Sequence, residues 1–322
     1  MTRTRRCWRT FPISVFASAA VIPLAAANAD TNAFNQIQEV RLGAAEGESA
    51  SDNGARADAP GPETREAPSE RALALRQSID AMTSLEDGQP GLPGQIELNF
   101  YNAWQTQSRV SDAALFTPQI KWTPRFSPNT ELGLAVPLIF FNGRVEGNSD
   151  IYLSWLQRWI QEQPDSWLPT FSTLNELRLP SGYHSEGVDW TFTGILAKEL
   201  GPGTVYLNGF IRSANGENDV DRGVGWANSY FSGDQPLDRR HFQWGFRTGY
   251  KWRFADSMGL ITNYVMQSNP LRGWHNQHIG EVALEWRLSE RLAIGPGVMF
   301  TLDGGRQTPN VGTGVKIHYA FN

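Results

Sequence analysis

Apolar and polar residues alternate one by one along most of the chain from Gln95 to Phe321. Segment 241–255 shows this most clearly, because aromatic residues occupy one face and basic and amide residues the other. The first face carries Phe242, Trp244, Phe246, Tyr250, Trp252 and Phe254, and the second carries His241, Gln243, Arg247, Lys251 and Arg253. Side chains of a β-strand point alternately to the two sides of its sheet, so the pattern predicts a strand with one apolar and one wet face.

Eleven further segments follow the same period of two, at 96–100, 116–122, 132–140, 151–155, 171–179, 188–196, 205–211, 258–266, 282–288, 292–302 and 311–321. With 242–254 they predict an all-β chain of about twelve strands. No stretch after the N-terminus approaches the roughly 20 apolar residues of a membrane-spanning helix, so a helical membrane protein is excluded. We expect an antiparallel, up-and-down transmembrane β-barrel over residues 95–322.

The connections between these segments alternate in length. Short ones lie at 125–129, 161–166, 201–203, 255–257 and 289–291, and longer ones rich in Gly and Asn lie at 142–150, 180–187, 213–240, 268–276 and 303–309. The first connection, near 108–112, is short where a long loop is allowed. Short turns at one end, long loops at the other and an even strand number are typical of bacterial outer-membrane barrels, which places the short turns at the periplasmic face.

Two further features predict that lipid, and not a soluble core, contacts the apolar face. Tryptophans gather toward strand ends, where they can form interfacial girdles: Trp104, Trp122, Trp155, Trp159, Trp167, Trp190, Trp244, Trp252 and Trp286. The C-terminal run from Gly314 to Phe321 resembles the signal that such barrels present to the barrel-assembly machinery, although that pattern usually stops at the aromatic and this chain adds Asn322. The expected partners are therefore outer-membrane lipids and that machinery.

Residues 1–29 read as a secretory signal peptide. A basic start precedes an apolar stretch from Phe11 to Ala26 and the small-x-small site Ala27-Asn28-Ala29. Arg5-Arg6 also permits a twin-arginine signal, which we favour less. Cys7 is the only cysteine, so the chain from Asp30 onward has no disulfide, thiolate metal site or cysteine nucleophile. Export and the barrel pattern together predict the outer membrane as the location.

Residues 30–94 form an acidic, low-complexity leader with twelve acids, five arginines and one aromatic residue. Such a composition cannot bury enough apolar surface to offset its ordering entropy, so we expect a mostly disordered periplasmic segment. Within it, Ser69 can cap a short helix over 69–85, on which Ala72, Leu75, Ile79 and Met82 recur at helical spacing. That helix is either a transient turn in a linker or an element that docks on, or plugs, the barrel.

Strand alternation places eight basic and five acidic side chains on the wet face, which makes the lumen wall mixed and slightly basic. They are Lys121, Arg178, Arg212, Arg247, Lys251, Arg253, Arg287, Lys316, Glu97, Glu176, Asp189, Glu281 and Glu285. They either brace the barrel as cross-strand ion pairs or form a constriction that selects solutes by charge. Twelve strands should leave a narrow bore.

The long connection 213–240 also carries the aromatic cluster Trp226, Tyr230 and Phe231, which suggests a lid or constriction loop over the barrel mouth. We expect no cofactor and no metal. Asp219 and Asp221 lack the closing bidentate glutamate of a calcium loop, and His275 with His278 form only a weak metal pattern. The pair His184-Ser185 departs from the His and Ser spacing of a membrane phospholipase, so we do not expect an enzyme.

The stretches 147–153, 177–182 and 189–207 carry short motifs, including Leu177-Arg-Leu-Pro180-Ser-Gly182 and the hairpin Leu200-Gly-Pro-Gly203. In these motifs the chain resembles the transporter-like outer-membrane β-barrel family associated with the meta-pathway of phenol degradation. The likeness covers roughly residues 142–322, and Asn148-Ser149 precede Asp150 where the family has a Gly-Asp pair. It implies passage of small solutes, aromatic or otherwise apolar ones among them, and assigns no residues.

Three functions are compatible with the sequence. A channel or transporter for small solutes is the first, a structural or adhesion barrel of the envelope with a filled lumen is the second, and an outer-membrane lipid hydrolase is a remote third. The basic residues do not cluster on one face, so nothing suggests a nucleic-acid partner.

Overall fold

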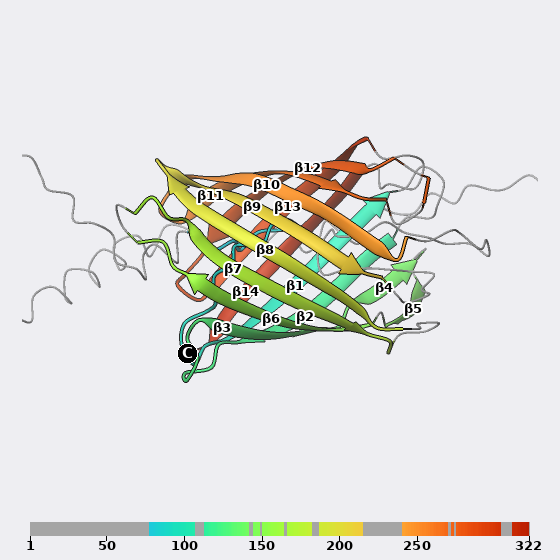
Figure 1. Cartoon of the computed structure of the whole chain (residues 1–322), viewed down its shortest axis with the longest axis horizontal. Helices are drawn as coiled ribbons and strands as arrows, with labels where there is room; N and C mark the ends of the chain where they lie inside the picture. Colours follow the sequence, from blue (N-terminus) through green and yellow to red (C-terminus); the bar gives the residue numbers. More distant parts are fainter. Residues whose placement is uncertain are drawn as a thin grey trace, which may run out of the picture. The chain divides into compact units, whose positions relative to one another are not determined.

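A computed structural model describes residues 77–106, 113–141, 144–148, 150–163, 166–181, 187–214, 240–269, 272–273, 275–303 and 311–321. These residues form one antiparallel sheet of fourteen strand segments that closes on itself (Figure 1). The segments are β1 (Ile96–Thr106), β2 (Ala113–Trp122), β3 (Thr130–Ala135), β4 (Leu138–Phe141), β5 (Arg144–Asn148), β6 (Ile151–Ile160), β7 (Thr170–Leu179), β8 (Asp189–Leu200), β9 (Gly203–Ser213), β10 (Phe242–Ala255), β11 (Met258–Gln267), β12 (Gln277–Arg287), β13 (Leu292–Asp303) and β14 (Val311–Phe321).

The fourteen segments amount to twelve barrel strands, as the alternation predicts. β3 and β4 are one predicted strand, interrupted at Val136-Pro137, and both pair with β2. Pro137 has no N–H to donate to a ladder, which accounts for a break at this position. β5 and β6 continue each other in the same way, because β5 pairs with β4 and β6 pairs with β3. β1 closes the barrel against β14, with Ile96 opposite Phe321.

The two faces of the sheet are those that the alternation predicts. Trp155, Leu207 and Trp252 lie on the outer face with about half of each side chain exposed, 51%, 47% and 47% respectively. Side chains on the inner face are polar and buried, among them Asn208 and Lys251. A one-residue slip of β10 would turn Arg247, Lys251 and Arg253 toward lipid, at a cost of about 2–4 kcal/mol for each one near the midplane, so the register is strongly fixed.

The short predicted connections join β2 to β3, β6 to β7, β8 to β9, β10 to β11 and β12 to β13, and all lie at one end of the barrel, which we call the turn end. The opposite ends of the strands, such as Ser213 of β9 and Phe242 of β10, form the other end of the barrel, which we call the loop end. The β8–β9 turn uses Gly201 at a φ of 60°, a left-handed conformation that suits glycine. No helix among the residues that the structure describes is long and apolar enough to cross a membrane.

The expected helix over 69–85 does not continue to residue 85. Of the predicted 69–85 range the structure describes 77–85, and only Gln77 there has helical backbone. Residues 78–94 follow an irregular path whose side chains and main chain contact the inner wall, and residues 69–76 of the predicted helix lie outside the described residues. The reason is that main-chain groups of this segment bond to the wall and not to one another. We call Gln77–Gly94 the plug segment.

Candidate functional site

The plug segment forms a loop inside the turn-end half of the barrel. Its first residue, Gln77, donates to Glu162 (2.6 Å) and accepts from Thr170 (2.8 Å), both at the turn end. Its middle reaches the centre of the strands, where Ser84 bonds to Glu281 of β12. It returns to the turn end at Gly94, whose N–H donates to Thr123 O (2.7 Å) just before β1 begins.

Side chains of the wall satisfy the main chain of the plug segment. Carbonyls of the segment accept from Tyr206 (2.5 Å), Lys251 (2.6 Å), Lys316 (2.9 Å), Arg247 (2.9 Å), Asn208 (2.9 Å) and Ser172 (2.6 Å). N–H groups of the segment donate to the carboxylates of Glu285 (2.9 Å), Glu281 (2.9 Å) and Glu131 (3.2 Å) and to the carbonyl of Gly295 (3.0 Å). A segment without regular secondary structure can be buried only with such partners.

Apolar residues of the plug segment also have a complementary surface. Ile79, Ala81 and Leu85 form a buried cluster with Ala197, Tyr206, Ile261 and Ala283 of the wall. Met82 is fully buried near the glycines of β13 and β14. Burying a side chain the size of isoleucine, leucine or methionine stabilises by about 1.5–3 kcal/mol. Ile79 and Met82, two of the residues whose spacing suggested an amphipathic helix, thus lie on the buried side of an irregular segment.

Glycines of the wall make room for this approach. A Cβ at Gly295 would collide with the Cα of Ala81 and with the carbonyl of Asp80, and a Cβ at Gly297 would collide with the carbonyl of Met82. Gly249 likewise faces Leu85. Because the main chain comes this close, any larger residue at these wall positions would push the plug segment away.

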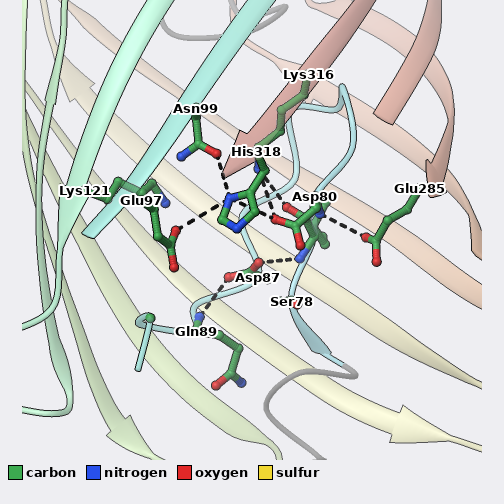
Figure 2. Close-up of polar contacts among 12 residues, drawn as sticks. Ser78, Asp80, Asp87, Gln89, Glu97, Asn99, Lys121, Glu285, Lys316 and His318 are labelled. Atoms are coloured by element: carbon green, nitrogen blue, oxygen red, sulfur yellow. Dashed lines mark hydrogen bonds and ion pairs between the residues drawn. The ribbon is translucent and has the colours of Figure 1, made fainter. Parts of the chain in front are cut away.

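Asp80 is the charged centre of the contact between the plug segment and the wall (Figure 2). Its carboxylate lies 3.1 Å from the Arg287 guanidinium, 3.5 Å from Nδ1 of His318 and 3.7 Å from the Lys316 ammonium. Burial alone would raise the pKa of Asp80, but the charges of His318, Arg287 and Lys316 hold it well below its usual range. Asp80 is therefore ionised when the plug segment is docked.

The thirteen predicted lumen residues lie on the inner face, and ion pairs join most of them. Across strands, Lys121 pairs with Glu131 (2.9 Å), Arg212 with Asp189 (2.9 Å) and Lys251 with Glu285 (2.8 Å), while Arg287 also pairs with Glu285 (3.0 Å) and Arg253 with Glu199 (2.8 Å). Glu97 lies 3.9 Å from His318, and the inner face of β7 carries Glu176. Cross-strand ion pairs of this kind are what the bracing hypothesis expects, and the role of the wall charges stays a prediction.

A second cluster lies at the loop end. Arg178 contacts Asp150 (2.6 Å) and Asp189 (2.9 Å), and Asp189 also contacts Arg212 (2.9 Å). All four side chains are buried. Sequence reasoning missed Asp150 as a partner, although its position directly before an alternating strand could have indicated it.

Other predicted residues stay apart from these clusters. His275 is exposed, and His278 shares a hydrogen bond (2.6 Å) with the hydroxyl of Tyr264 on the outer face. The loop aromatics Trp226, Tyr230 and Phe231, the acids Asp219 and Asp221, and the pair His184-Ser185 lie outside the described residues. Within the described ranges, no three His, Cys, Asp or Glu side chains come together in a way that could hold a metal ion.

Arg247 connects the tip of the plug segment to the wall. Its guanidinium donates to Ser84 O (2.9 Å) and lies 4.8 Å from the centre of the Phe210 ring. A cation over an aromatic face is attracted by the ring quadrupole. Arg247 therefore lies at the boundary between the filled turn-end half and the loop-end half of the lumen.

Comparisons with known proteins agree with the fold. No family model matches the sequence, and no curated protein matches it. The structure is similar to that of an outer-membrane channel from Pseudomonas putida F1, with a TM-score of 0.55 at 11% identity, over 74% of this chain and 100% of that chain. More distant are the NanC porin (TM-score 0.47, 9% identity, 70% of this chain and 99% of that one) and the KdgM porin (0.44, 9%, 70% and 99%).

These observations define a class. A closed antiparallel barrel with an apolar outer belt, a polar inner wall and short turns at one end has the fold of an outer-membrane β-barrel. Within that class the chain is a twelve-stranded barrel whose lumen holds a segment from before the first strand.

Proposed function

We propose that the protein is an outer-membrane channel or transporter for small solutes, and that solutes pass when the plug segment moves. The observation that carries the proposal is the filling of the turn-end half of the bore by an irregular segment, held by separate hydrogen bonds, most of them to wall side chains, and not by a sheet ladder. Each such contact can open without disrupting the barrel, because the strands pair only with one another.

The inner wall favours solutes with an apolar part. Leu156, Leu174 and Ile195 form a buried apolar cluster on the inner face, next to the plug segment at Gly88. Val265, Ile279 and Met299 are further buried apolar residues of the inner face, on β11–β13. Apolar surface inside a polar-walled bore suits small aromatic or otherwise apolar solutes, which agrees with what the family resemblance implies.

Liposome swelling with the full chain tests the proposal. Gly295→Val should displace the plug segment and increase permeability to small solutes, because its side chain collides with Ala81 and Asp80. Gly209→Val is the matched control, since a Cβ at this mid-strand glycine meets nothing within 4 Å. A series of solutes of graded size, including phenol-sized aromatics, would measure which solutes pass. Impermeability of both variants and of the wild type to every solute would exclude a channel.

A structural or adhesion barrel of the envelope is the second candidate, and the filled lumen favours it specifically. If the plug segment is a permanent part of the interior, Gly295→Val should lower the free energy of unfolding without opening a path. The swelling assay therefore separates the two candidates. A lipid hydrolase stays the remote alternative, and activity toward phospholipid that His184→Ala abolishes would support it.

A further inference from the structure

The wall of the lumen contacts the plug segment mainly through the main chain. Between Gln77 and Gly88, six wall side chains donate to carbonyls, and Glu285, Gly295 O and Glu281 accept from the N–H groups of Asp80, Met82 and Ser84. Every peptide offers carbonyls and N–H groups at this spacing. The contacts therefore depend on the irregular, looped path of the main chain more than on the identity of most of its side chains.

The groups that make these contacts are held by the wall itself. Asn263 donates to Glu281 (2.7 Å), and Lys251 (2.8 Å) and Arg287 (3.0 Å) both donate to Glu285. None of these three contacts involves the plug segment. The carboxylates thus keep their places when the segment leaves, and such preorganised groups lose little freedom on binding.

Two features of the wall would select among peptides. The apolar surface of Ala197, Ile261 and Ala283 receives side chains at the positions of Ile79, Ala81 and Leu85. The basic side chains of Arg287 and Lys316, with His318 beside them, receive an acidic side chain at the position of Asp80. The glycines of β13 permit close approach of a main chain, but they leave no room for a bulky side chain at the position of Ala81.

We propose that the inner wall of β7–β14 is a binding site for a peptide in an irregular, looped conformation, which the plug segment occupies as a tethered ligand. The ligand class is a peptide of about the length of Gln77–Gly88, with apolar side chains around one acidic residue. The proposal goes beyond passage of solutes, because binding is measured without conduction. If the protein does not conduct solutes, the peptide-binding proposal is unaffected. If it does conduct them, peptide binding is still not established.

The test uses the full chain with a plug segment that cannot dock. Ile79→Glu with Leu85→Glu places two charges against the apolar surface and leaves every wall residue unchanged. The probe is a fluorescent synthetic peptide of the natural sequence 77–88, and its anisotropy is measured in detergent micelles. The double variant should bind it saturably. The wild type should bind the probe at least about tenfold more weakly, because its own tethered segment competes for the site at a high effective concentration.

A second probe tests whether the wall contacts the main chain. The same peptide, N-methylated at Asp80, Met82 and Ser84, lacks the three N–H groups that the wall accepts. Its affinity for the double variant should fall by about tenfold or more. Equal affinity of the two peptides, equal binding to wild type and variant, or no saturable binding would each overturn the proposal. If the double variant does not fold, the milder Asp80→Asn variant is used in the same two binding measurements. The same three outcomes would then overturn the proposal.

Discussion

Asp80→Asn is the most direct test of how the plug segment is held. The substitution keeps the size of the side chain and removes its charge, while Arg287 and Lys316 keep theirs. In the docked state the carboxylate lies 3.1 Å from Arg287, 3.5 Å from His318 and 3.7 Å from Lys316. The variant therefore leaves a group of cations facing a neutral amide, whereas an undocked plug segment would leave them free to contact water.

The expected cost follows from burial. Two charges 3.1 Å apart attract by about 5 kcal/mol at an effective dielectric constant of about 20, before any desolvation is counted. Removing one partner of a fully buried pair costs about 3–5 kcal/mol. Because the Asp80 and Arg287 side chains keep 14% and 22% of their exposure, solvent screening reduces the expected loss to about 2–3 kcal/mol. That loss shifts the docking equilibrium by about 30- to 150-fold.

Single-channel recording in planar bilayers measures the result. Asp80→Asn should open more often than the wild type, by a factor in that range. Asp256→Asn is the matched control, since Asp256 is exposed in the β10–β11 turn at the same end of the barrel. If the two variants behave alike, Asp80 does not hold the plug segment, and the electrostatic reasoning is wrong.

Three further predictions concern pH, the loop-end cluster and the outer face. Burial raises the pKa of Glu86 to about 7 and also raises that of Asp87, so the docked state binds protons that the free segment releases. Docking should weaken, and openings become more frequent, as the pH rises from about 4.5 to about 7, and Glu86→Gln should reduce that dependence. Arg178→Met removes the buried guanidinium that contacts both Asp150 and Asp189 and should lower the free energy of unfolding by about 3–5 kcal/mol in urea titrations, whereas Arg253→Met, at a partly exposed pair, should cost about 1 kcal/mol or less. Leu207→Arg on the outer face should cost about 2–4 kcal/mol in lipid vesicles, and Leu207→Met should cost little.

The sequence predicts the barrel well because each strand reports its own two faces. Residues such as Trp244 and Lys251 differ so strongly in solvation that one strand fixes its own register, without information from its neighbours. The division of a predicted strand into β3 and β4 was also accessible, since Pro137 lies within the alternating run. Local pattern is sufficient wherever the solvent on each side of the sheet decides the fold.

Contacts between distant residues are a different case. Asp80 meets His318 and Lys316 of the last strand, and Asp150 meets Arg178, yet nothing in either local pattern specifies the partner. The helical spacing of Ala72, Leu75, Ile79 and Met82 identified a segment able to bury one side. It could not show that the wall would supply the hydrogen bonds that a helix would otherwise make within itself.

The composition of the plug segment explains why it neither joins the sheet nor continues as a helix. Its last seven residues contain three glycines and two prolines: Gly88, Pro90, Gly91, Pro93 and Gly94. Proline has no N–H to donate, and glycine loses more conformational entropy than other residues when it is fixed in a helix or strand. Its main-chain groups must then bond to the wall or to water. In the turn-end half of the barrel the inner face binds the plug segment of the same chain. Alternation alone identifies this face only as polar. A two-residue period therefore distinguishes lipid from a polar interior, but it cannot distinguish a water-filled bore from one filled by a polar segment of the same chain.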